Sequence, residues 1–161
     1  MNPVPLFLII VTLPLLLGGC GVEEPVAEVK PVEEMPINPN LKYEIKDDEV
    51  TITGCYKKAS SELTIPATIE GKPVTSIGKD AFGYCSLLTS ITIPDSVSVI
   101  GLAAFSGCKS LTTVNFLGDA PRVSDFPFSI NEPTTIYRKA DAKGWGPTFG
   151  RKPVKIITEK P

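Results

Sequence analysis

Residues 77–91 of the chain read IGKDAFGYCSLLTSI, and residues 100–114 repeat the pattern as IGLAAFSGCKSLTTV. Matched positions lie 23 residues apart, and the same offset places Val123 beneath Ile100 and Phe128 beneath Phe105. A fixed short period is typical of a solenoid, in which each unit buries its apolar face against its neighbours. This stretch therefore predicts a stack of repeats.

The pattern within one unit predicts mainly β structure. We expect a short strand over 89–93, a turn at Pro94–Asp95, a second strand over 97–100 and a single helical turn over Leu102–Ser106. The fold class is thus a repeat solenoid, mainly β with short helical turns, of about three 23-residue units. The side chains expected inside it are Ile91, Ile93, Val97 and Ile100, together with an aromatic column of Phe82, Phe105 and Phe128.

The segment LTSITIPDSVSVIGLAAFSGCKSL, residues 88–111, resembles the BspA-type leucine-rich repeat of bacterial surface proteins. The resemblance is specific over 63–117 and looser over 118–128. It implies a leucine-rich-repeat-like right-handed superhelix, export from the cytoplasm, and a surface or adhesive role. It implies no particular ligand, because one fold serves many functions.

The repeats, assigned to 63–130, are flanked by an opening hairpin over 41–62 and a cap over 131–161. The hairpin is expected because alternating residues surround the turn-forming Asp47 and Asp48, which we interpret as a solvated turn and not a metal cluster. Five extra residues near 70–74 predict a surface loop. In the Gly-rich cap, Trp145 is expected to act as an apolar lid, and an exposed aromatic platform is the alternative.

The N-terminal residues point to an exported protein. An apolar run over 4–17 is too short to span a membrane comfortably and has the length of a signal-peptide core. The next residues, Leu17-Gly18-Gly19-Cys20, resemble the lipobox of bacterial lipoproteins. The resemblance implies removal of the signal peptide 1–19 and attachment of acyl chains to Cys20, which would anchor the chain to a membrane of the cell envelope, with the leaflet left open. Residues 2–19 contain no Lys or Arg, which a signal peptide usually has near its start, so an uncleaved anchor and an ordinary secretory signal stay as alternatives.

Residues 20–40 are expected to form a tether between the lipid and the folded domain 41–161. From Gly21 to Asn40 the chain holds five Glu, one Lys and four Pro, a composition that favours extended, unpacked backbone. This segment carries a net charge of −4, whereas the whole chain carries −2. The folded domain 41–161 therefore carries a net charge of +2 and is slightly basic.

The cysteines are expected to be structural. Cys85 and Cys108 occupy equivalent positions in consecutive units, which predicts stacked, buried thiols, and a disulfide between them is the alternative. With Cys20 acylated, Cys55 leaves an odd number of thiols. Because the chain has no histidine and no CxxC motif, we expect no metal site and no cofactor.

The basic C-terminal segment is the best binding patch that the sequence offers. Arg138, Lys139, Lys143, Arg151, Lys152 and Lys155 are opposed there only by Asp141, with Trp145 among them. An anionic polymer, lipid headgroups or a sulfated glycan would suit such a patch, and a solvated basic face is the alternative.

A Ser-His-Asp or Cys-His site is excluded without histidine, and no catalytic residue is assigned. We expect a non-enzymatic envelope lipoprotein that binds an unknown protein or glycan, and not nucleic acid. The interaction would use the exposed strand face or the basic patch. The alternatives are a structural subunit of an envelope assembly, with the solenoid edge as its interface, and an enzyme of unknown type.

Overall fold

The computed structural model describes residues 39–56, 61–128 and 133–157. The predicted signal peptide, Cys20 and nearly all of the tether therefore lie outside the described residues. Within the described ranges no helix is long and apolar enough to cross a membrane.

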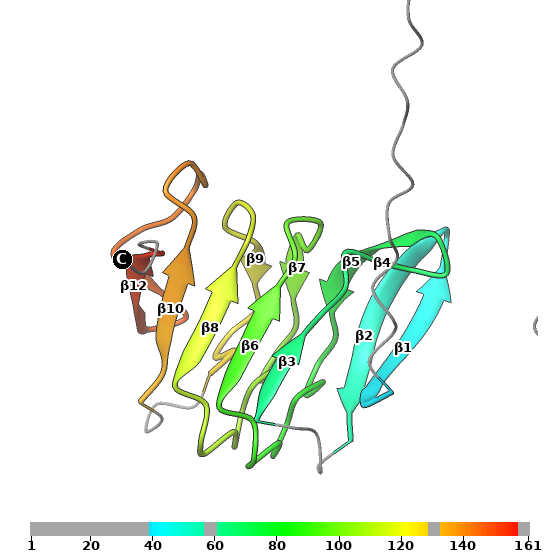
Figure 1. Cartoon of the computed structure of the whole chain (residues 1–161), viewed down its shortest axis with the longest axis horizontal. Helices are drawn as coiled ribbons and strands as arrows, with labels where there is room; N and C mark the ends of the chain where they lie inside the picture. The colour runs from blue at the N-terminus through cyan, green and yellow to red at the C-terminus, as the bar shows by residue number, and fades with distance from the viewer. Residues whose placement is uncertain (1–38, 57–60, 129–132, 158–161) are drawn as a thin grey trace, which may run out of the picture. The chain divides into compact units, whose positions relative to one another are not determined.

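The described residues form two six-stranded sheets, which we call sheet A and sheet B (Figure 1). Most neighbouring strands run parallel, and the chain passes from one sheet to the other within each repeat. Sheet A contains β1 (Leu41–Lys46), β2 (Glu49–Cys55), β4 (Thr68–Ile69), β5 (Lys72–Ile77), β7 (Val99–Ile100) and β9 (Arg122–Val123). Sheet B contains β3 (Glu62–Thr64), β6 (Ser90–Ile93), β8 (Thr113–Phe116), β10 (Thr135–Arg138), β11 (Thr148–Phe149) and β12 (Lys152–Ile156).

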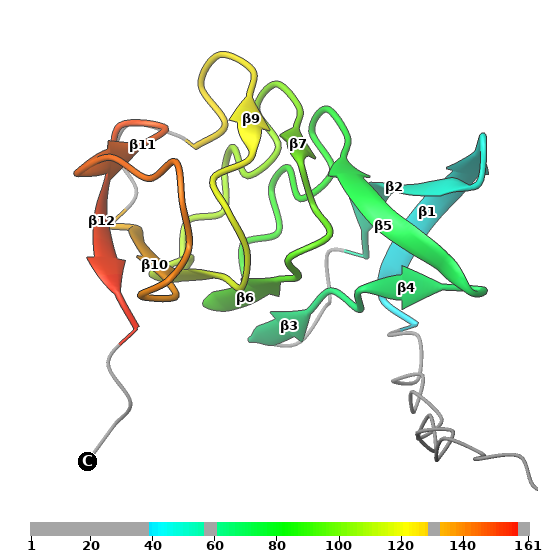
Figure 2. The same ribbon diagram turned by 90° about the horizontal axis from the view of Figure 1, so that it is seen from above.

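The strand register follows the sequence repeat. In sheet A, Ile77 pairs with Ile100, and Ile100 pairs with Val123. In sheet B, Ile91 pairs with Val114. Viewed from above, β5, β7 and β9 follow one another on the side opposite β6 (Figure 2). The predicted solenoid of stacked β units is confirmed.

The expected helical turn over Leu102–Ser106 is wrong, because the described residues contain no helix. The corner between the sheets instead consists of tight turns whose alternate amides bond to the next repeat. In this corner Phe105 N–H donates to Pro127 O of the next repeat at 2.9 Å, as Phe82 N–H donates to Ala104 O at 2.8 Å one repeat earlier. A helix would use these amides within itself, so stacking between repeats decides the local conformation. The corners require left-handed backbone at Asp80, Tyr84, Ala103, Gly107 and Phe126.

The core lies between the two sheets and contains the predicted side chains. Phe82 and Phe105 stack with their ring centroids 5.2 Å apart, and Phe105 and Phe128 stack at 5.1 Å. All three rings are buried, as are the four inward aliphatic side chains that the pattern predicted. The aromatic column is therefore confirmed.

Three tight hairpins have two consecutive residues with positive φ, the geometry of a type I′ turn. Asp47 and Asp48 form the predicted N-terminal turn, and Asp48 makes an ion pair with Lys72. The second turn, at Glu70–Gly71, joins β4 to β5, so the surplus residues form a hairpin where we expected a loop. The third turn, at Gly150–Arg151, joins β11 to β12 in the cap.

The second and third hairpins share a sequence motif. Residues 68–74 read TIEGKPV, and residues 148–154 read TFGRKPV. The two copies nevertheless join different sheets, because β5 pairs with β2 and β7 in sheet A whereas β12 pairs with β10 in sheet B. The cap therefore extends sheet B by one hairpin, and sheet A ends at β9.

Candidate functional site

The outward side of sheet B presents two rows of mostly polar side chains, which we call the strand face. Side chains alternate along each strand, so the inward neighbours of these residues belong to the core. One row contains Glu62, Ser90, Thr113 and Thr135, and the other contains Thr64, Thr92, Asn115, Tyr137 and Lys155.

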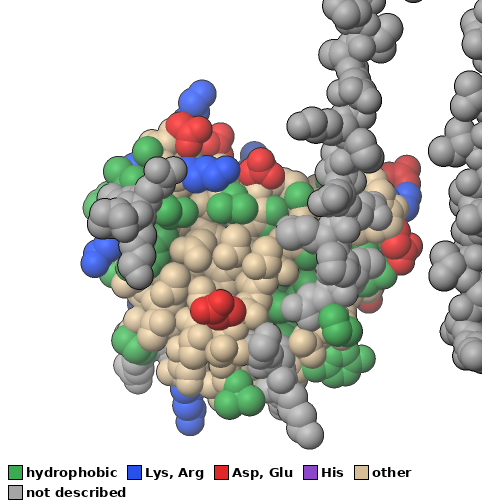
Figure 3. All heavy atoms as spheres, viewed as in Figure 1, with side chains coloured by type: hydrophobic (Ala, Val, Ile, Leu, Met, Phe, Trp, Pro, Cys, Tyr) green, Lys and Arg blue, Asp and Glu red, His purple; other side chains and the backbone are tan. Residues whose placement is uncertain are grey.

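The centre of the strand face is neutral and hydrogen-bonding. Figure 3 shows it as a broad area with few hydrophobic or charged side chains. Within this face Asn115 Nδ2 donates to Thr92 Oγ1 at 3.5 Å, which is long for a hydrogen bond. The ionic side chains stand at the two ends of the sheet, with Glu62 on β3 and Lys155 on β12.

The six basic residues of the predicted patch lie in different surroundings. Arg138 stabilises the loop after β10, because its guanidinium donates to Lys139 O at 2.8 Å and to Ala140 O at 3.1 Å. The guanidinium of Arg151 lies 4.5 Å from the ring centroid of Phe126, on the side of sheet A. Lys152 is only 5% exposed, so it offers little contact area.

The remaining three lysines, Lys139, Lys143 and Lys155, are exposed. Lys155 lies on the strand face beside Tyr137, whereas Lys139 and Lys143 belong to the loop between β10 and β11. Of the six predicted basic residues, Lys155 therefore lies on the strand face and the other five lie outside it.

Trp145 closes the C-terminal end of the core. Its ring centroid lies 4.9 Å from that of Phe116 and 4.9 Å from that of Phe149, and its indole N–H donates to Gly118 O at 3.2 Å. Because the indole is half-buried and its donor is occupied, it serves as the expected lid.

None of the three described cysteines forms a disulfide; Cys85 and Cys108 belong to the core, and Cys55 packs against it. Cys85 and Cys108 are buried, and the Cys108 thiol donates to Phe82 O at 2.9 Å. A hydrogen bond with Cys85, together with burial, raises the pKa of the Cys55 thiol above its ordinary range. A raised pKa suppresses the reactive thiolate, so Cys55 is poorly suited to act as a nucleophile.

Two open cavities lie near the C-terminal end of the described chain. One of about 190 Å³ is lined by Val123–Pro127 and Gly150–Arg151. The other, of about 340 Å³, is lined in part by Asp95, Asp119, Lys139 and Asp141. Asp119 already accepts the Lys143 backbone N–H at 2.6 Å, and no group of residues in the described ranges has a geometry suited to a metal ion.

The polar rows of the strand face could have been named from the sequence. Their signal is the alternation in Ser90-Ile91-Thr92, Thr113-Val114-Asn115 and Thr135-Ile136-Tyr137, which places one apolar residue between two polar residues in each strand. The cavity at Val123 had no such signal, because it depends on which sheet the cap joins.

Comparison with known proteins identifies the repeat. The profile of the family described as BspA type leucine rich repeat region matches residues 54–141 in six copies. No curated protein matches the chain.

Solved structures of bacterial leucine-rich repeat proteins are similar to the chain. A leucine rich repeat protein of T. pallidum is 22% identical over 68% of this chain and 55% of its own, with a TM-score of 0.46. A leucine-rich repeat protein from Bacteroides capillosus is 27% identical over 67% of this chain and 100% of its own, with a TM-score of 0.47. A leucine rich cell surface protein from Faecalibacterium prausnitzii is 26% identical over 76% of this chain and 29% of its own, with a TM-score of 0.43. The chain thus spans about half the length of the T. pallidum protein.

Proposed function

The chain belongs to the family of proteins with BspA-type leucine-rich repeats, and from this premise we propose that it is a non-catalytic binding module of the bacterial cell envelope. Its repeat domain would mediate adhesion by binding a protein or a glycan through the strand face. Leucine-rich-repeat solenoids typically act as binding or adhesion modules, and proteins with BspA-type repeats are typically surface or envelope proteins.

The observation that carries this proposal is the neutral, hydroxyl-rich centre of the strand face. Three successive strands, β6, β8 and β10, present hydroxyl and amide groups to solvent at the regular strand spacing of roughly 4.8 Å. Such groups donate and accept hydrogen bonds, which suits the hydroxyls of a glycan or the backbone of a peptide. Tyr137 adds an aromatic surface beside Lys155 at the C-terminal end of the same face.

The proposed envelope location rests on the lipobox-like residues before Cys20. Two or three acyl chains on Cys20 would hold the protein durably at a membrane, whereas a single chain would bind reversibly. The Pro/Glu-rich tether would then separate the repeat domain from the bilayer, so that the strand face can reach a partner.

Binding is tested with the full-length protein on arrays of immobilised glycans and secreted proteins. Thr92→Lys and Asn115→Lys place charges in the centre of the strand face, and we expect them to weaken binding by tenfold or more. Thr68→Lys is the matched control, because Thr68 is an exposed threonine of β4 in sheet A. Equal binding by all three variants and the wild type would exclude the strand face as the site.

The anchor is tested separately by the intact mass of protein extracted from membranes. The proposal expects loss of residues 1–19 and a gain of two or three acyl chains, both absent from a Cys20→Ala variant. A full-length mass without lipid would refute lipidation and leave the binding experiment unaffected.

A further inference from the structure

Among the described residues, sheet A ends in a strand with one unpaired side. On its paired side, Arg122 N–H donates to Ser98 O at 2.8 Å, and Ser124 N–H donates to Ile100 O at 3.0 Å. In a parallel ladder the intervening residue points its N–H and C=O the opposite way. The backbone groups of Val123 therefore face away from β7, and no described strand pairs with β9 on that side. We call this free side, from Arg122 to Asp125, the β9 edge.

The apolar column of sheet A is also unfinished at this position. Ile77 is 1% exposed and Ile100 is 0% exposed, because each is covered by the next repeat. Val123 holds the equivalent place in the next repeat and is 40% exposed, and Phe126 beside it is 52% exposed. The cap leaves this position open because β12 pairs with β10 in sheet B.

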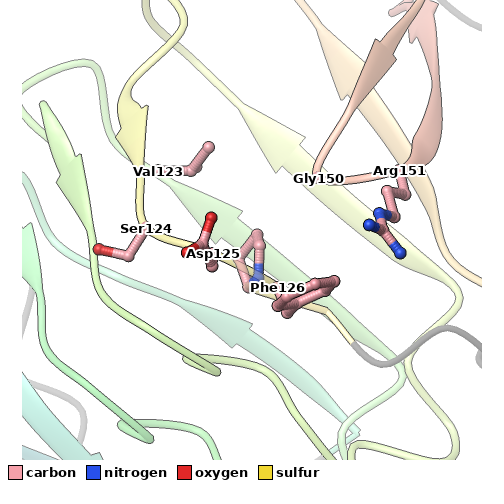
Figure 4. Close-up of a pocket in the computed structure, with 7 residues that line it drawn as sticks. Val123, Ser124, Asp125, Phe126, Gly150 and Arg151 are labelled. Carbon is pink, nitrogen blue, oxygen red and sulfur yellow. The ribbon is translucent and has the colours of Figure 1, made fainter.

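The cavity of about 190 Å³ lies along the β9 edge. In Figure 4 the segment from Val123 to Phe126 forms one wall, and Gly150 and Arg151 lie across from it. An apolar cavity of roughly 150 Å³ is sufficient for a benzene molecule, so this space has room for one apolar side chain. Arg122 and Asp125 are exposed at the same edge, and Arg151 lies over the ring of Phe126.

We propose that the β9 edge binds an extended peptide segment of a partner protein, which adds one strand to sheet A. The peptide backbone bonds to the free groups of Val123, as in other cases of strand addition to a sheet edge. One apolar side chain of the peptide stacks on Val123 and fills the cavity. An acidic side chain next to it faces Arg122, because alternate residues of a strand point to opposite sides.

Charge complementarity favours an acidic peptide over a second copy of this chain. Two arginines and one carboxylate, Asp125, surround the edge, so an acidic partner gains more attraction than a basic one. If two copies paired β9 antiparallel with Val123 opposite Val123, Arg122 would face Ser124 and not Asp125. A two-residue strand also offers far less area than the roughly 800 Å² per partner of a stable dimer.

The test uses the full-length protein in mild detergent and a fluorescein-labelled peptide. The peptide imitates the strand that one further repeat would add beside β9. The peptide copies Asp95–Leu102, the segment that contains β7, with the change Val99→Glu to face Arg122. A control peptide carries the further change Ile100→Asp, which removes the apolar side chain. We expect saturable binding of the first peptide in fluorescence anisotropy and binding at least tenfold weaker for the control peptide.

Two protein variants locate the site. Val123→Lys is expected to weaken peptide binding at least tenfold. Val99→Lys is the matched control, because Val99 is 41% exposed in the same sheet but lies in β7, which is paired on both sides. Circular dichroism verifies that each variant is folded, and the comparison of the two peptides decides the question if Val123→Lys does not fold.

Three results would overturn the proposal. The first is a dissociation constant weaker than about 1 mM for the wild type, and the second is equal binding by the wild type and a folded Val123→Lys variant. The third is a dimer of the wild type, seen by light scattering, that Val123→Lys abolishes, since a second copy would then occupy the edge. None of these results bears on the strand face.

Discussion

Phe105→Ala tests whether stacking between repeats supplies the stability of the solenoid. The ring of Phe105 is fully buried and lies between two others, at 5.2 Å from Phe82 and 5.1 Å from Phe128. Truncation of a buried phenylalanine to alanine costs about 3–5 kcal/mol. Because the central ring loses two stacked partners, each contributing about 0.5–1.5 kcal/mol, we expect a value near the upper end of that range.

The assay is guanidinium denaturation of the full-length protein in detergent, followed by the fluorescence of Trp145, the single tryptophan. Phe128→Ala is expected to cost less, because Phe128 stacks on one ring of the column and not on two. Phe126→Ala is the control, because this ring is 52% exposed and is not part of the stacked column. We expect a smaller loss, which includes the contact with Arg151 of about 0.5–1 kcal/mol. If Phe105→Ala costs no more than Phe126→Ala, the column does not stabilise the stack.

Three further predictions concern single sites. Gly107→Ala is expected to destabilise the fold by about 1–2 kcal/mol through its φ of 75°. Gly107→Ala should lower the free energy of unfolding more than Gly144→Ala, at φ 77°, because a Cβ on Gly107 would lie 2.7 Å from the ring of Tyr84. Equal losses of stability for the two variants in thermal denaturation would contradict this close contact. The Tyr43 hydroxyl donates to the Glu70 carboxylate at 2.7 Å, and this hydrogen bond raises the pKa of Tyr43 above 10.0. Its contribution to stability is complete below pH 10.0 and is lost as the pH rises through the folded pKa, so in an ultraviolet titration Tyr43→Phe should remove a late-ionising phenol. Alkylation of Cys55 by iodoacetamide at pH 8 should be slower than that of free cysteine, and its rate should still rise above pH 9. The reason is that a hydrogen bond with Cys85 and burial raise the pKa of the Cys55 thiol. Alkylation as fast as that of free cysteine would refute this environment.

The core of the solenoid could be predicted because its information is local and repeated. Phe82 and Phe105 hold equivalent positions in consecutive units, and each ring needs only the next unit to be buried. The conformation of the corners could not be predicted in the same way. Residues 102–106 favour a helical turn when considered alone, but hydrogen bonds to the adjacent repeat select alternating tight turns.

The two candidate sites differ in the same way, because the strand face depends on local strand geometry and the basic patch depends on tertiary packing. Alternation within β6, β8 and β10 is enough to predict a polar strand face, since strand geometry alone sends those side chains outward. The basic residues of the C-terminal segment gave a predicted patch from their number alone. Burial of Lys152 and the hydrogen bonds of Arg138 depend on how the cap packs, which a count of charges does not contain.

By itself, the sequence determined the repeat period, the identity of the core residues and the polar character of the strand face. Each of these follows from a nearest-neighbour rule that operates within one unit or between adjacent units. Only the tertiary structure decided where the stack ends. The segments TIEGKPV and TFGRKPV have nearly the same local preferences, yet the first joins sheet A and the second joins sheet B. The choice depends on which strand has an unpaired side next to the hairpin once the preceding repeats have stacked. Among the described residues, it leaves the outer side of β9, and with it Val123, without a strand partner.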